Sequence, residues 1–416
     1  MIIISVPDNN IKERKYILDI FFNEFLGLNY QLEIGESDYK VVLENGKVLS
    51  IKDNFFNQYP NDLEYLKLEN IPKSIEELDI FAASFFMLTR WEEYVNKKRD
   101  IHERFPATES LAYKQGFLDK PIVNEYVEEL KNKLLEVDDS LKFKKHEYRV
   151  FLTHDVDMPL KYPYIGSGFR EIVGDLVKRK DLRLFFRNLA TKIKVALKLE
   201  KDPFDTFKYL MGMSEKVGVK SYFFFMGKGS TTYDNMYKSD DAFIKKLIEN
   251  IKQRGHNIGI HPTYNAYTDS EQLKKEKEEL EKNLESDILF GREHYLRFEV
   301  PITWQIWEDN GMVWDSTLSY ADKEGFRCGV CYPYSVFNIL TRKKLKLKEK
   351  PLIVMDSSFV TYQKDISPKE MEHKIVNLIN NVKKYNGEFV LLWHNSSFHT
   401  DEWKKYKYIY ERVVSI

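Results

Sequence analysis

Two aspartates follow an apolar segment at a spacing that suits metal chemistry. Residues 151–157 read Phe-Leu-Thr-His-Asp-Val-Asp, a strand-like run that leads into Asp155 and Asp157. Side chains alternate along a strand, so both carboxylates point to the same side. Two converging acids repel each other unless a cation or a proton lies between them. We interpret the pair as a general base next to a metal ligand, with two solvated loop acids as the alternative.

Two histidines end apolar segments in a similar way. Residues 255–265 read Gly-His-Asn-Ile-Gly-Ile-His-Pro-Thr-Tyr-Asn, and His261 stands where Pro262 must stop the strand. Residues 390–395 read Val-Leu-Leu-Trp-His-Asn, which places His394 at another strand end. Imidazole with carboxylate suits zinc or a neighbouring first-row metal, and a histidine can donate a proton near neutral pH. The alternative for each histidine is a structural hydrogen bond.

The elements that must position these residues alternate between strand and helix. Such alternation predicts a parallel sheet or barrel, in which functional side chains gather at the carboxyl ends of the strands. Arg297 falls in one expected strand, where it could fix a buried carboxylate in its charged form. We expect strands at residues 149–153, 221–226, 257–260, 295–298, 352–355 and 388–393.

Taken in their order along the chain, the motifs resemble those of the NodB-homology polysaccharide deacetylases (carbohydrate esterase family 4). The resemblance extends from about residue 148 to the C-terminus. The stretches quoted above, with Leu-Arg-Phe at residues 296–298, carry the resemblance. It implies an α/β fold with a distorted (β/α) barrel of the polysaccharide deacetylase type. It also implies removal of N-acetyl, or O-acetyl, groups from a sugar. The implied roles are Asp155 as base, Arg297 as its brace, His394 as acid, and Asp157 and His261 as metal ligands.

The resemblance further implies a divalent metal, zinc first, with cobalt, nickel or iron as alternatives. The family's second metal histidine falls on Asn265 in this chain. An amide oxygen is a poorer zinc ligand than imidazole, so His256 or His154 is an alternative third ligand. Asp322 or Asp315 is expected to orient the catalytic histidine.

Further basic residues are expected to hold an anionic part of the substrate. Arg292, His294 and Arg327 are the candidates. The expected substrate is an acetylated sugar carried on a nucleotide or a lipid, as in assembly of a surface polysaccharide or glycoconjugate. Cys328 and Cys331 have zinc-knuckle spacing, but a structural zinc site needs four ligands, so we interpret them as packing residues.

Two other functions remain open. The first is hydrolysis of a different C–N bond, of the deformylase or cyclic amidase type, which a barrel with a metal would also suit. The second is a non-catalytic glycan-binding protein whose metal site has degenerated at Asn265. Asp155 and His394 favour catalysis, because a binding module needs neither a base nor an acid.

Length and composition bound these interpretations. The 416 residues carry 64 Lys and Arg against 65 Asp and Glu, and this net charge of −1 argues against a nucleic-acid binder. The length favours two domains, and we place a smaller α/β domain of unassigned function at 1–140 and the deacetylase-like domain at 141–416. The first part resembles the N-terminal domain fused to a cytoplasmic subgroup of these deacetylases. We expect a cytoplasmic location, because only two cysteines, no secretory signal and no membrane-spanning run are found.

One basic segment is amphipathic. Residues 176–201 carry nine Lys or Arg against two acids, with apolar residues at helical spacing. Peripheral contact with an anionic membrane, or with a lipid-linked substrate, is one interpretation. The preferred interpretation is a helix packed on the domain with a solvated basic face.

Overall fold

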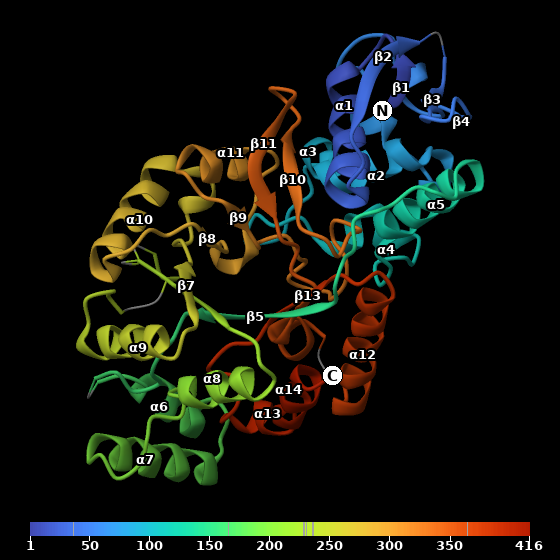
Figure 1. Cartoon of the computed structure of the whole chain (residues 1–416). Coiled ribbons are helices and arrows are strands. Elements are labelled where there is room, and N and C mark those ends of the chain that lie inside the picture. The colour runs from blue at the N-terminus through green and yellow to red at the C-terminus, as the bar shows by residue number, and fades with distance from the viewer. Residues whose placement is uncertain (36, 165, 228, 230, 235–236, 364) are drawn as a thin grey trace.

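The N-terminal part of the chain is built on a small mixed sheet (Figure 1). Its strand order is β2-β1-β3-β4, with β1 parallel to β2 and antiparallel to β3. The strands are β1 (Ile2–Pro7), β2 (Tyr30–Gly35), β3 (Tyr39–Val42) and β4 (Val48–Ile51). The computed structural model describes residues 1–35, 37–164, 166–227, 229, 231–234, 237–363 and 365–416.

Helices cover this small sheet and connect it to the rest of the chain. α2 (Ile80–Thr89) is apolar on every side and all ten of its residues are buried, as expected of a helix enclosed by other elements. Asp79 caps it by accepting hydrogen bonds from the backbone amides of Phe81 and Ala82. The others are α1 (Ile11–Leu18), the π-helix η1 (Asp19–Leu26), α3 (Trp91–Val95), α4 (Leu111–Lys114), α5 (Ile122–Val137) and the 3₁₀ turns η2 (Phe56–Gln58), η3 (Leu68–Asn70), η4 (Ile75–Glu77) and η5 (Ala107–Glu109).

The second part holds a nine-stranded sheet in the order β10-β11-β9-β8-β7-β6-β5-β13-β12. All neighbouring pairs are parallel except β10 with β11. Parallel pairing brings the carboxyl ends of the central strands to one edge, where the candidate residues lie. The strands are β5 (Arg149–Val156), β6 (Tyr222–Phe225), β7 (Asn257–Ile260), β8 (Phe290–Gly291), β9 (Trp314–Asp315), β10 (Tyr334–Asn338), β11 (Lys343–Glu349), β12 (Val354–Met355) and β13 (Glu388–Leu392).

Helices separate most of these strands, and most of them bury an apolar face, whereas no residue of α7 is buried. The helices α6 and α7 extend from the lower left of the molecule (Figure 1). The set comprises α6 (Phe169–Val177), α7 (Leu182–Ala196), α8 (Phe207–Lys216), α9 (Ala242–Gln253), α10 (Ser270–Leu284), α11 (Ile302–Asp309), α12 (Pro368–Lys384), α13 (Asp401–Lys404), α14 (Lys407–Val414), the 3₁₀ turns η6 (Ala266–Thr268) and η7 (His294–Leu296), and the π-helix η8 (Ser358–Tyr362).

The mixed α/β class predicted from the sequence is confirmed, whereas a closed barrel is not shown. Within the described residues, β10 and β12 are the two edges of the large sheet and do not pair with each other. The strand predicted at 295–298 is wrong, since that segment forms the turn η7 and the strand before it ends at Gly291. A Cβ at Gly291 would lie 1.9 Å from the carbonyl oxygen of Ile260, so glycine permits the close approach of β7 and β8.

The two parts share one continuous apolar core. Buried polar groups also cross between them. Glu93 of α3 accepts hydrogen bonds from Arg90 and from Arg327, whose Nε atoms both lie 2.9 Å from its Oε1. The Tyr16 hydroxyl donates to the carbonyl of Ser335 at 2.9 Å. Arg327, predicted to bind substrate, is therefore a structural partner of the N-terminal part and is not among the residues that line the cavity described below.

Candidate active site

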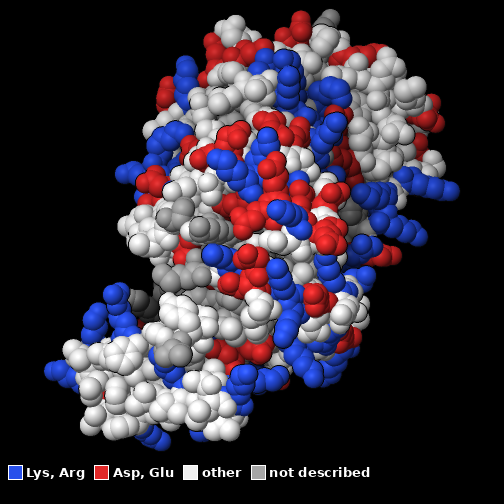
Figure 2. All heavy atoms as spheres, turned by 90° about the vertical axis from the view of Figure 1, so that its left-hand side faces the viewer, with Lys and Arg blue, Asp and Glu red and all other residues white. Residues whose placement is uncertain are grey.

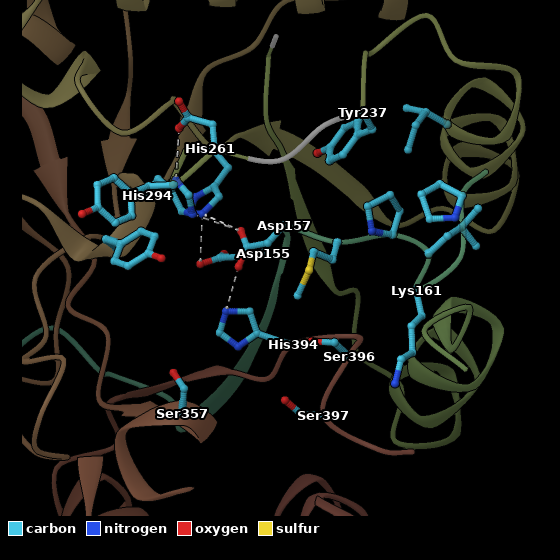
Figure 3. Close-up of a pocket in the computed structure, with 18 of the residues that line it drawn as sticks. Asp155, Asp157, Lys161, Tyr237, His261, His294, Ser357, His394, Ser396 and Ser397 are labelled. Atoms are coloured by element: carbon cyan, nitrogen blue, oxygen red, sulfur yellow. Dashed lines mark ion pairs between the residues drawn. The ribbon is translucent and has the colours of Figure 1, made fainter. Parts of the chain in front are cut away.

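Strand ends bring together an acid pair and three histidines at one edge of the large sheet (Figure 3). Asp155 lies at the end of β5 and Asp157 just beyond it. His261 follows β7 and His394 stands two residues after β13. His294 lies in η7, three residues after β8. The structure thus gathers four of the residues predicted from strand ends and adds His294 to them.

Three of these residues form a group with the donor atoms of a metal site. The ligating atoms of Asp157, His261 and His294 all lie within 4.8 Å of one another. Asp157 Oδ1 is 3.1 Å from Nε2 of His261 and 3.8 Å from Nε2 of His294. One carboxylate with two imidazoles suits zinc and its first-row neighbours, and leaves positions for water or substrate.

The other ring nitrogen of each histidine faces an oxygen, within hydrogen-bond geometry at His261 and only as a charged neighbour at His294. His261 Nδ1 is 2.7 Å from the carbonyl oxygen of Arg292, which requires an N–H at Nδ1 and leaves the Nε2 lone pair for a ligand. His294 Nδ1 lies 3.5 Å from the carboxylate of Asp234. Such outer partners fix the orientation of metal-binding histidines, so the two rings are preset for coordination through Nε2.

The turn that carries His294 has an unusual backbone. Tyr295 and Leu296 have φ angles of 60° and 55°, in the left-handed region that residues with side chains rarely adopt. This turn places His294 in the metal group and Tyr295 in the wall of the pocket. Strained backbone of this kind is concentrated at functional sites.

The electrostatics of Asp157 fit a cation. Burial alone would raise its pKa, but the nearby imidazoles, His261 first and then His294 and His394, hold the pKa well below its usual range through the positive charge that they carry when both ring nitrogens are protonated. Within the described residues, its Oδ1 is buried without a partner in hydrogen-bond geometry. A buried carboxylate oxygen surrounded by imidazole nitrogens needs a shared positive charge, which a divalent metal would supply.

The predicted base is paired with a different arginine from the one expected. Arg292 NH1 donates to Asp155 Oδ1 at 2.9 Å, and also to the hydroxyl of Thr153. Arg292, predicted to contact substrate, is fully buried behind the acid and is not among the residues that line the cavity. Oδ2 of Asp155 lies 3.9 Å from Nε2 of His261, on the side of the metal group.

Arg297 does not contact Asp155. It binds Asn265, the residue predicted as the third metal ligand. Its guanidinium is packed between the rings of Tyr264 and Tyr267, 3.9 and 4.0 Å from their centroids. Its NH1 donates to the amide oxygen of Asn265 at 3.2 Å, so Asn265 stabilises this arginine instead of facing the metal group. Two predictions are corrected here: Arg297 does not brace Asp155, and His294, assigned above to substrate, occupies the place expected for Asn265.

The two alternative ligands are also directed away. His154 Nδ1 lies 2.7 Å from the carbonyl oxygen of Trp393, and its Nε2 faces Ser221. His256 Nδ1 accepts from the backbone amide of Ser221 at 3.0 Å. Both histidines therefore stabilise the strands. His154 points to the opposite side of β5 from Asp155, and His256 stands just before β7.

His394 is oriented by Asp356, which the sequence analysis did not identify. His394 Nδ1 lies 2.7 Å from Asp356 Oδ1, and its backbone amide donates to Oδ2 at 2.8 Å. Its Nε2 lies 3.5 Å from Asp157 Oδ2. Burial would lower the pKa of His394, but Asp356, together with the two site aspartates, raises it to about 10. His394 is therefore held as an acid that points towards the metal group.

The two acids predicted to orient His394 lie in other contacts. Asp315 accepts from the backbone amide of Thr317 at 3.0 Å, and Asp322 accepts from the amide of Ala107 at 3.3 Å. A usable signal for Asp356 was present, since it follows the apolar run 352–355, the pattern that revealed Asp155. The pairing of β12 with β13 is what brings it beside His394, and that pairing cannot be read from spacing.

These residues open into a cavity of about 980 Å³. Tyrosines and tryptophan contribute much of its wall, and residues of 158–164, with Ser167, form one side. Arg104 of the N-terminal part also reaches the wall, where it donates to the Tyr295 carbonyl at 3.1 Å and to the Tyr362 hydroxyl at 2.9 Å. The cavity is therefore shaped by both parts of the chain.

Comparison with protein families gives a match for the N-terminal part. Residues 2–139 match a family of unknown function, DUF7033. No curated protein matches the chain.

Nine solved chains show similarity to this one. A Mycobacterium smegmatis protein described as a candidate polysaccharide deacetylase is 16% identical, with a TM-score of 0.42, and the match covers 66% of this chain and 86% of that one. A carbohydrate esterase family 4 pseudoenzyme from Bacillus anthracis is 10% identical with a TM-score of 0.32, covering 64% and 60%. The catalytic domain of a peptidoglycan N-acetylglucosamine deacetylase from Eubacterium rectale is 14% identical with a TM-score of 0.31, covering 65% and 86%. With TM-scores below 0.5, these similarities do not establish a function.

Proposed function

We propose that the chain is a metal-dependent hydrolase that removes an acetyl group from the nitrogen, or the oxygen, of an acylated sugar. The observation that supports this proposal most strongly is that a candidate base and a candidate acid both lie beside the candidate metal ligands. Asp155 Oδ2 lies 3.9 Å from His261, and His394 Nε2 lies 3.5 Å from Asp157. A base and an acid beside a Lewis-acid site are what amide hydrolysis requires.

Each side chain has a role that its contacts support. Asp155 accepts a proton from the attacking water, because Arg292 occupies its Oδ1 and leaves Oδ2 on the side of the metal group. His394 donates a proton to the departing amine through Nε2, because Asp356 holds its Nδ1. Asp157, His261 and His294 would hold a divalent metal, zinc first, which supplies a Lewis acid and lowers the pKa of a bound water.

The cavity supports a sugar substrate. Its wall includes Tyr164, Tyr233 and Tyr295 together with Trp403, and flat aromatic faces with polar edges suit the apolar faces and hydroxyls of a sugar ring. Its volume exceeds what an acetyl group alone would fill. We propose that the acetylated sugar is carried on a nucleotide or a lipid.

Acetate release tests this proposal. The protein loaded with zinc or cobalt should release acetate from N-acetylglucosamine oligomers, measured by a coupled acetate assay. Asp155→Asn should lower the rate by at least about a hundredfold, because the amide cannot accept the proton. Asp322→Asn is the matched control, since this carboxylate lies outside the cavity wall, and should stay within about threefold of the wild type.

The result that would contradict the proposal is equally direct. A folded, metal-bound protein that releases no acyl group from N- or O-acetylated sugars would exclude deacetylation. Equal rates for Asp155→Asn and the parent would exclude Asp155 as the base.

A further inference from the structure

The helices α6 and α7 form a hairpin that packs mainly on itself and projects from the body of the protein (Figure 1). α7 has fifteen residues and none is buried. A helix of that length within a globular protein normally buries one face. The outer face of this hairpin is therefore free to contact something outside the chain.

The exposed face of α7 is an apolar stripe. Leu182, Phe186, Ile193 and Leu197 are 60%, 62%, 49% and 64% exposed. Their spacing of four, seven and four residues places them within roughly a 60° arc at about 100° per residue. α6 and the segment after α7 add the exposed side chains of Phe169, Val177 and Leu199. Contiguous exposed apolar surface of this size is a mark of a docking site.

Basic residues border the stripe. Arg183, Arg187 and Lys194 lie within about 80° of it on one side of the helix. Residues 169–201 hold ten Lys or Arg against four Asp or Glu, although the chain as a whole carries a net charge of −1. Figure 2 shows this end of the molecule, at the bottom of the view, as a white surface with Lys and Arg at its edges.

An apolar stripe with a basic border suits an anionic lipid surface. We propose that the α6–α7 hairpin docks on an anionic lipid bilayer, with the apolar stripe in the interface and the basic border on the headgroups. Each basic residue near such a surface contributes about 1 kcal/mol, and the apolar side chains add their burial. A second copy of the chain fits less well, since the same segment of that copy is also basic and offers the border little opposite charge.

The hairpin is also tied to the candidate active site. Residues of 158–164, with Ser167, line one wall of the cavity, and Ser167 lies two residues before the start of α6. Lys192 of α7 donates from Nζ to the carbonyl of Ser167 at 2.7 Å. A docked hairpin would hold this wall beside the headgroups. If the proposed function holds, the acetylated sugar is presented at the membrane surface on a lipid carrier; this inference rests on that function.

Co-sedimentation with vesicles tests the docking. Full-length protein should sediment with phosphatidylglycerol–phosphatidylcholine vesicles at about 0.1 M salt, and at least fivefold less with pure phosphatidylcholine or at 0.5 M salt. The variant Leu182→Ser/Phe186→Ser/Ile193→Ser/Leu197→Ser should lose most of this binding. Val48→Ser/Ile101→Ser/Ile302→Ser/Val313→Ser, which changes four exposed apolar residues elsewhere, is the matched control and should bind as the parent does.

Several outcomes would overturn the inference. They are equal sedimentation of the α7 variant and the parent, no preference for anionic vesicles, or a concentration-dependent dimer that the α7 variant abolishes. Binding is read without activity, so it separates the two proposals. Docking without acetate release would refute only the proposed function, and acetate release without docking would refute only this inference. The α7 variant should keep its rate on water-soluble oligomers and lose rate on vesicle-borne acetylated glycolipid.

Discussion

Asp157 is the residue on which the candidate site depends. Its carboxylate lies 3.1 Å from His261, 3.8 Å from His294 and 3.5 Å from His394. Nδ1 of His261 is bonded to a carbonyl and Nδ1 of His294 lies 3.5 Å from a carboxylate, so both rings present Nε2 to a cation, whereas the third ring is held by Asp356 as an acid. The same carboxylate therefore joins the metal group to the proton donor.

Asp356 should control the proton donor without touching the metal group. Asp356→Asn keeps the shape of the side chain but removes the charge that contributes most to the raised pKa of His394. We expect kcat to fall by about 10² to 10³ with little change in KM, because proton donation to the leaving group is impaired. Metal content should stay at the parental value, and Asp322→Asn serves as the control. A loss of kcat below threefold would exclude this role.

Site residues that end apolar runs could be predicted from the sequence. The contacts that depend on how neighbouring strands pair could not. Asp155, Asp157, His261 and His394 could be found because each follows a recognisable strand. Arg292 and His294 were noticed, but as substrate contacts. They follow β8, which has only two residues, and the short apolar run Ile-Leu-Phe at 288–290 was not recognised as the start of a strand.

At the scale of elements, the order of the sheet explains the site. β5 lies between β6 and β13, and β7 lies between β6 and β8, so the ends of these five strands converge. The alternation of strands and helices predicted most of this parallel arrangement. The short β8 and β9 were not predicted, because each has only two residues. The antiparallel pair β10–β11 was missed although Lys and Leu alternate in β11, as they do in a half-exposed strand.

The buried ring of His154 should make the sheet sensitive to acid. Burial lowers its pKa to about 4, against about 6.5 in an unfolded chain, so the folded state favours the neutral ring. The unfolded state therefore binds more protons below about pH 6.5, and stability is lost as pH falls from there towards 4. Between pH 7.5 and 5.0 this group should cost about 2 kcal/mol.

Urea unfolding at those two pH values measures the effect. His154→Gln should be less stable than the parent at pH 7.5 but should lose about 2 kcal/mol less on acidification. His373→Gln, at an exposed position on α12, should keep the parental difference. An unchanged pH dependence in His154→Gln would show that this ring is not the acid-sensitive group.

At the scale of the whole molecule, the two parts of the chain form one structure around the cavity. Their apolar cores are continuous, and Arg104 from the N-terminal part fixes two tyrosines of the cavity wall. No helix in the described part of the chain combines the length and apolar character needed to cross a bilayer. The sequence indicated the two parts but not their contact, because Glu93 and Arg327 are separated by more than half of the chain.

Glu93 should be essential for this contact. Burial would raise its pKa, but Arg327 and Arg90 lower it to about 2, so it is charged in the fold. Glu93→Ala leaves two buried guanidinium groups without their carboxylate and should cost about 3 to 5 kcal/mol in urea unfolding. Glu147→Ala removes an exposed ion pair and should cost less than about 1 kcal/mol. Similar small costs for both variants would contradict a structural role for Glu93.

Asp157, His261 and His294 are proposed to hold one divalent metal. Elemental analysis of the purified protein, after incubation with zinc and removal of excess, tests it most directly. We expect about one zinc per chain in the parent and in Asn265→Ala, and a loss of bound zinc in His294→Ala, with folding checked by circular dichroism. Zinc that persists in His294→Ala and disappears in Asn265→Ala, or a parent that binds none, would contradict the account.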